Sequence, residues 1–190
     1  ILFKRNLKSI KQIKSLTSSI KSLTKDNKFP ILIDEEGVRV TRLIEIINHN
    51  ISANFFGRLY ELDKKFAVSI YKIYLKNLCK NLRKIGININ TIPVLDILRK
   101  NTNSIIGNRS FSKKKEIVKQ LGRVTIKECR SHKIINVVKH MPGHGCSTAD
   151  SHLTLPKVFL SEKNLNKMDF YPFKSCSAKL AMTAHILYSK

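Results

Sequence analysis

Residues 85–96, with the sequence IGININTIPVLD, carry the clearest sign of the fold. They join the end of an apolar pattern of helical period to a short apolar run that is typical of a strand. Gly86 stands where a left-handed helix cap belongs, and Asp96 follows the strand directly. A helix that leads into a strand in this way is the repeating connection of an α/β fold with a parallel sheet.

Amphipathic stretches of helical period flank this strand. A capping-box pattern at Ser9 and Gln12 predicts the start of a first helix, which ends near Leu23. A second helix is predicted from Lys64 to Ile85. Its expected apolar face consists of Phe66, Ile70, Ile73, Leu78, Leu82 and Ile85. Ser112 is predicted to cap a third helix, whose expected apolar face consists of Ile117, Val118, Leu121, Val124 and Cys129.

Five short apolar runs predict strands that alternate with these helices. The runs are 1–3, 30–33, 87–95, 134–138 and 180–184. In parallel α/β folds, catalytic groups gather where strands end and loops begin. We therefore expect convergence of the polar residues just beyond the runs, which are Asp34, Glu35, Glu36, Asp96, Lys139, His140 and His185.

Length and composition favour one packed domain. The chain has 190 residues, of which 42% are hydrophobic, with 7 Gly and 5 Pro, which excludes collagen-like and low-complexity classes. The net charge is +23, from 36 Lys and Arg against 13 Asp and Glu. This excess is diffuse and lacks interleaved aromatic residues, so nucleic-acid binding is a minor alternative.

The four cysteines, Cys79, Cys129, Cys146 and Cys176, form no CxxC pair. They predict reduced, buried thiols of a cytosolic protein rather than a zinc or dithiol site. No apolar run approaches the roughly 18 residues of a membrane span, so no membrane partner is expected.

The segment 139–156, KHMPGHGCSTADSHLTLP, is the richest in chemistry. His140 and His144 are four residues apart, a spacing that could serve a metal on a helix, but Pro142 and two glycines exclude a helix here. No metal is therefore predicted. Asp150 and His152 form the better candidate, because the carboxylate can orient the imidazole and stabilise its charged form during proton transfer.

Six blocks, in order along the chain, share a pattern with one enzyme family. They are 1–6 (ILFKRN), 34–42 (DEEGVRVTR), 86–96 (GININTIPVLD), 106–111 (IGNRSF), 139–156 and 182–185 (MTAH). They resemble the motifs ILFxRN, DxEGGRVxR, GINxNxAPVLD, IGDRSF, KHFPGHGxxxxDSHxxLP and MTAH of glycoside hydrolase family 3, specifically its bacterial β-N-acetylhexosaminidases of cell-wall recycling.

The resemblance implies that residues 1–190 are part of a catalytic (β/α)8 TIM barrel, with about its first five strands. It also implies a cytoplasmic, cofactor-free hydrolase that removes terminal N-acetylglucosamine from peptidoglycan-derived muropeptides. The carbohydrate substrate is the expected partner, and the sequence does not indicate an oligomeric state. The alternatives are a glycoside phosphorylase of the same family and a non-catalytic remnant.

Roles follow from the same resemblance, residue by residue. His152 is expected to act as general acid and base, with Asp150 as its partner. The expected sugar-binding residues are Asp34, Arg42, Arg109, Lys139 and His140. A retaining enzyme also needs a nucleophile, which the family supplies as an aspartate after a later strand. No residue after His185 can supply it, so we expect a sequence that is incomplete at both ends and an isolated chain that is inactive.

Two positions depart from the family motifs. Val38 replaces the second glycine of EGG, so that a backbone requiring positive φ would be strained or shifted there. Asn108 replaces an aspartate and thereby removes a charge next to Arg109.

Overall fold

The computed structural model describes residues 1–47, 50–100, 102–147 and 155–189. Its main sheet has four parallel strands in the order β1-β2-β3-β5. These are β1 (Leu32–Ile33), β2 (Ile89–Asn90), β3 (Ile135–Met141) and β5 (Leu180–Thr183). Leu2 adds a parallel bridge to Ile33 on the outer side of β1. All five predicted runs thus contribute to one parallel sheet, which confirms the predicted α/β fold.

The strand boundaries differ from the predicted ones. The run at 1–3 is reduced to the single bridge of Leu2, and the run at 87–95 pairs regularly only at Ile89 and Asn90. β3 extends to Met141, so Lys139 and His140 lie on the strand rather than beyond it. A second parallel pair, β4 (Lys157–Val158) with β6 (Leu187–Tyr188), was not predicted.

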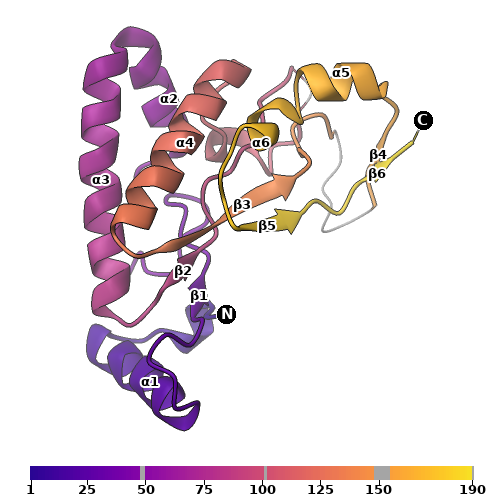
Figure 1. Ribbon diagram of the computed structural model, residues 1–190. Helices are drawn as coiled ribbons and strands as arrows, with labels where there is room; N and C mark the ends of the chain where they lie inside the picture. Colours follow the sequence, from indigo (N-terminus) through magenta and orange to yellow (C-terminus); the bar gives the residue numbers. More distant parts are fainter. Residues whose placement is uncertain (48–49, 101, 148–154, 190) are drawn as a thin grey trace.

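The helices cover the sheet unevenly. Figure 1 shows α2, α3 and α4 together on one side, with α1 below β1 near the N-terminus. Their bounds are α1 (Ile10–Leu23), α2 (Ala53–Leu62), α3 (Lys64–Lys84) and α4 (Lys115–Ser131). Two short helices precede β5, namely α5 (Glu162–Lys167) and α6 (Tyr171–Lys174). Two 3₁₀ turns complete the set, η1 (Lys4–Asn6) and η2 (Gly107–Arg109). None of these helices is long and apolar enough to cross a membrane.

The predicted helix ends are confirmed for α1 and α3 and wrong for α4. The Ser9 hydroxyl accepts a hydrogen bond from the Gln12 amide at 3.2 Å, as the capping box predicts. Gly86 ends α3 with φ +83°, and a Cβ there would lie 2.3 Å from the Thr17 hydroxyl, so that close contact with α1 also requires glycine. Ser112 does not cap α4, which begins three residues later and has Lys114 at its N-cap.

The core lies between the sheet and the helices. The buried face of α3 runs through Ala67, Tyr71, Leu75, Leu78, Cys79 and Leu82. Phe66 and Ile73, predicted for that face, are 53% and 55% exposed, because the buried residues follow spacings of three and four from Ala67 instead. Cys79 and Cys129 meet between α3 and α4 with their sulfurs 3.5 Å apart. All four cysteines are free, but only these two are fully buried.

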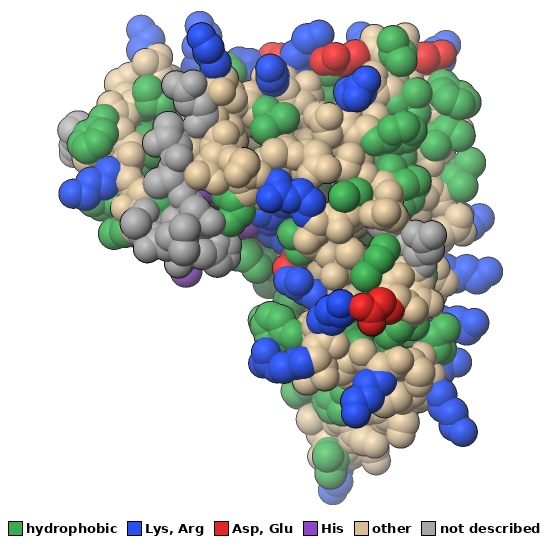
Figure 2. All heavy atoms as spheres, turned by 180° about the vertical axis from the view of Figure 1, so that it is seen from behind, with side chains coloured by type: hydrophobic (Ala, Val, Ile, Leu, Met, Phe, Trp, Pro, Cys, Tyr) green, Lys and Arg blue, Asp and Glu red, His purple; other side chains and the backbone are tan. Residues whose placement is uncertain are grey.

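The basic side chains form no single patch on the face seen in Figure 2. Lys and Arg are scattered over it, with few Asp or Glu between them. This distribution agrees with the diffuse charge of the sequence and supplies no continuous groove for a phosphate backbone.

Candidate active site

A pocket of about 410 Å³ opens beyond the carboxyl ends of the strands. Its walls come from the loop after β1, the loop that carries η2, the end of β3 and the residues after β5. The five predicted sugar-binding residues all line it: Asp34, Arg42, Arg109, Lys139 and His140. His144 and His185 line it as well. The structure therefore brings together side chains that are up to 151 positions apart in the sequence, from Asp34 to His185.

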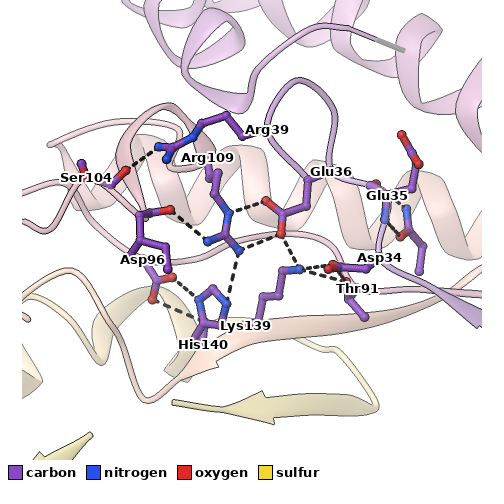
Figure 3. A network of polar contacts seen from close by, with 12 residues as sticks. Asp34, Glu35, Glu36, Arg39, Thr91, Asp96, Ser104, Arg109, Lys139 and His140 are labelled. Atoms are coloured by element: carbon purple, nitrogen blue, oxygen red, sulfur yellow. Dashed lines mark hydrogen bonds and ion pairs between the residues drawn. The ribbon is translucent and has the colours of Figure 1, made fainter. Parts of the chain in front are cut away.

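Lys139 and Asp34 form the centre of the network on the pocket wall (Figure 3). The Lys139 side chain is only 2% exposed, and its Nζ lies 2.5 Å from Asp34 Oδ1 and 2.9 Å from the Thr91 hydroxyl. Asp34 Oδ2 accepts a second hydrogen bond from Arg42 Nη2 at 2.8 Å. Burial acts to raise the pKa of Asp34, but the Lys139 charge and hydrogen bond hold it below its usual value. Asp34 therefore faces the pocket as an ionised acceptor.

Glu36 links two cations of the pocket. Its carboxylate accepts hydrogen bonds from Arg109 Nε at 2.8 Å and Nη2 at 2.9 Å, and it also forms an ion pair with Lys139. Although burial acts against it, this forked pairing raises the pKa of Arg109. Because Glu36 neutralises Arg109, the Asn108 departure leaves that arginine with a charge partner.

Asp96 fixes the orientation of His140. Asp96 is fully buried, and its Oδ2 lies 2.6 Å from His140 Nδ1 while Oδ1 accepts the His144 backbone N–H at 2.6 Å. Burial acts to raise the pKa of Asp96, and the His140 charge and hydrogen bonds lower it. The other ring nitrogen of His140 lies 3.4 Å from Arg109 Nη2 and faces the pocket. Asp96 thus orients its neighbours, which is the role that the sequence allowed for it.

Sequence reasoning named the wall of the pocket but missed its supports. Glu36 and Thr91 were not among the predicted binding residues, although Glu36 lies within the block 34–42 and follows β1 directly. Arg39 lines the pocket and donates to the Ser104 carbonyl. Glu35, expected to converge with the others, does not line the pocket and is buried behind its wall. The predicted catalytic residues Asp150 and His152 lie outside the described residues.

Comparison with known proteins identifies the family of this site. The model described as "Glycosyl hydrolase family 3 N terminal domain" matches residues 1–190. The chain belongs to glycosyl hydrolase family 3. A curated relative, the β-hexosaminidase of Neisseria gonorrhoeae, is 35% identical over 192 residues, covering 99% of this chain and 53% of the relative.

Two solved structures of NagZ from Neisseria gonorrhoeae resemble this family 3 chain closely. The native protein superposes with a TM-score of 0.92 at 35% identity, covering 98% of this chain and 55% of that one. Its complex with N-trifluoroacetyl-D-glucosamine gives a TM-score of 0.92 at 34% identity, with the same coverage. The chain thus spans about half the length of these relatives. The similarity confirms the fold of the family's N-terminal barrel-like domain.

The valine that departs from the family 3 motif lies in strained backbone. Val38 has φ +45° and, with Arg39, occupies a tight turn closed by two hydrogen bonds of 3.2 Å between Gly37 and Val40. A β-branched residue is disfavoured in the left-handed region by about 1–2 kcal/mol. The sequence expectation of strain is therefore confirmed.

Val38→Gly is expected to stabilise the protein. Relief of strain exceeds the conformational entropy cost of glycine, about 0.5–1 kcal/mol, so the free energy of unfolding should rise by about 0.5–1 kcal/mol. Urea unfolding of the two proteins measures the difference. Val40→Gly, in the same turn but without positive φ, is the matched control and should destabilise the protein. An unchanged or lower midpoint for Val38→Gly contradicts the argument.

Proposed function

We propose that the complete protein is a retaining β-N-acetylhexosaminidase that releases terminal, non-reducing N-acetylglucosamine from peptidoglycan-derived muropeptides. The observation that carries this proposal is the pocket wall itself, where Asp34, Lys139 and Arg109 are held in an ion-paired network at the carboxyl end of a parallel sheet. Fixed donors and acceptors of this kind match the hydroxyl and amide groups of a neutral aminosugar. Family membership and a relative bound to an N-acylated glucosamine support the same substrate class.

The five wall residues are assigned to the sugar in this proposal. Asp34 accepts hydrogen bonds from hydroxyl groups, since its pKa keeps it ionised at neutral pH. Arg42, Arg109 and Lys139 donate to sugar oxygens, and His140 donates or accepts with the ring nitrogen not used by Asp96. The wall binds the sugar in one orientation, which presents the anomeric carbon to the reacting groups.

The chemistry of the proposal is a double displacement. His152, oriented by Asp150, protonates the departing oxygen while an aspartate attacks the anomeric carbon, and the same histidine then deprotonates water. The resemblance places that aspartate after a later strand of the barrel, beyond Lys190. Two inversions at one carbon give net retention of the β-configuration.

The test is hydrolysis of 4-nitrophenyl N-acetyl-β-D-glucosaminide by the complete protein, followed by proton NMR of the sugar. We expect the β-anomer to appear first and the α-anomer to follow only by mutarotation. The first appearance of the α-anomer contradicts the double displacement. Absence of turnover by a folded, complete protein contradicts the proposed function.

Two rival functions are separated by the same preparation. A phosphorylase would release sugar 1-phosphate, and only when phosphate is present, whereas the proposed hydrolase is indifferent to phosphate. A nucleic-acid-binding module would bind heparin with an affinity that falls steeply with salt. The four free cysteines support a reducing, cytoplasmic location for the enzyme, which is also part of the proposal.

A further inference from the structure

Glu35 is a fully buried acid next to the pocket wall. Its Oε1 accepts the Thr41 hydroxyl at 2.5 Å, and its Oε2 accepts the backbone N–H groups of Arg42 at 2.7 Å and Leu43 at 3.0 Å. Across the described ranges, no Lys, Arg or His nitrogen lies within 4.0 Å of this carboxylate. Its hydrogen bonds therefore all go to the far end of the loop that it begins.

The backbone of Glu35 is fixed from the other side by β2. The Glu35 N–H donates to Asn90 Oδ1 at 3.0 Å, and Asn90 Nδ2 donates to the Glu35 carbonyl at 2.9 Å. Asn90 is itself fully buried in the sheet. The side chain of Glu35 thus anchors the returning loop to a residue that the sheet already holds in place.

This anchor determines where Arg42 lies. Asp34 precedes Glu35 directly, and the loop returns to place Arg42 Nη2 2.8 Å from Asp34 Oδ2 on the pocket wall. We propose that Glu35 is a positioning residue whose carboxylate closes the 36–41 loop and holds Arg42 against Asp34. The inference rests on the proposed function, because Arg42 and Asp34 are sugar-binding residues only within it. Burial raises the pKa of Glu35, which agrees with a carboxylate retained for its geometry at an electrostatic cost.

Glu35→Ala and Glu35→Gln separate geometry from charge. Alanine removes all three hydrogen bonds, whereas glutamine offers one oxygen to the two backbone N–H groups and an amide N–H to the Thr41 hydroxyl. In the complete protein, Glu35→Ala should lower kcat/KM for the nitrophenyl glycoside about 100-fold, mainly through KM, as expected when binding groups shift by about 1 Å. Glu35→Gln should restore KM to within about threefold of the original protein.

Asp63→Ala is the matched control for loss of stability. Asp63 caps α3 through the Phe66 N–H at 3.0 Å and does not line the pocket. Its removal should lower the unfolding midpoint and leave KM unchanged. If Asp63→Ala raises KM as much as Glu35→Ala does, a general loss of stability explains both and the positioning role is wrong.

A readout independent of turnover keeps the inference testable. Hydrogen exchange of the Arg42 and Leu43 amides should be faster in Glu35→Ala and normal in Glu35→Gln. If Glu35→Ala does not fold, Thr41→Val removes one of the three bonds and should raise KM about threefold to tenfold. If the original protein hydrolyses nothing, the proposed function fails, and exchange still decides the positioning role. Unchanged exchange and KM in Glu35→Ala, or no restoration by Glu35→Gln, overturns it.

Discussion

Asp34→Asn is expected to lower kcat/KM of the complete protein about 10³-fold toward the nitrophenyl glycoside. A hydrogen bond to a charged group contributes about 1.5–3 kcal/mol, so the loss of two such bonds to sugar hydroxyls corresponds to roughly 10²- to 10⁴-fold. The amide also leaves Lys139 and Arg42 with half of their shared counter-charge. The expected fall therefore includes both lost contacts and a disturbed wall.

Steady-state kinetics and urea unfolding check this prediction together. The Asp34 side chain is 22% exposed, so its ion pairs are partly screened and stability should fall by no more than about 1–2 kcal/mol. Glu45→Gln is the matched control, because it removes one carboxylate from the surface pair with Lys4, where the acid is 72% exposed. It should change neither kcat/KM nor the unfolding midpoint. A fall of less than about threefold in Asp34→Asn contradicts the sugar-binding role.

The fold was predictable where a local signal and the tertiary structure agree. Ser9 and Gln12 indicate the start of α1, because capping depends on atoms three residues apart. α2 was missed although Ser52 caps it through the Phe55 N–H at 3.2 Å, since its short apolar pattern includes exposed Phe55 and Leu62. β4 and β6 were missed because each is a two-residue strand whose partner lies thirty positions away in the sequence.

The site was predictable as a set of residues but not as a network. Strand ends and motif order placed the five wall residues in one pocket. The pairing of Glu36 with Arg109 and Lys139 joins positions far apart in the chain, and no local pattern shows which carboxylate meets which cation. The orientation of Glu35 was predicted incorrectly because alternation after a two-residue strand does not determine which side chain faces the pocket.

Asp96→Ala is expected to destabilise the protein more than any other single change considered, by about 3–5 kcal/mol. It removes one partner of a fully buried pair and leaves the His140 ring and the His144 N–H without the acceptor they use, at 2.6 Å in each case. Asp96→Asn keeps the shape and one acceptor oxygen, so it should cost only about 1–2 kcal/mol. Urea unfolding at neutral pH measures both.

The pH dependence gives this prediction its sign. The pKa of Asp96 in the folded protein lies below its ordinary value of 3.8, because the His140 charge and three hydrogen bonds outweigh the effect of burial. The folded state then binds fewer protons than the unfolded state, so the stabilisation is complete above pH 3.8 and is lost as the pH falls through the folded pKa. The gap in unfolding free energy between the original protein and Asp96→Asn should therefore narrow below that pH. A gap that stays constant into acid, or an Asp96→Ala variant that unfolds at the original midpoint, means that Asp96 does not support His140 as a charged partner.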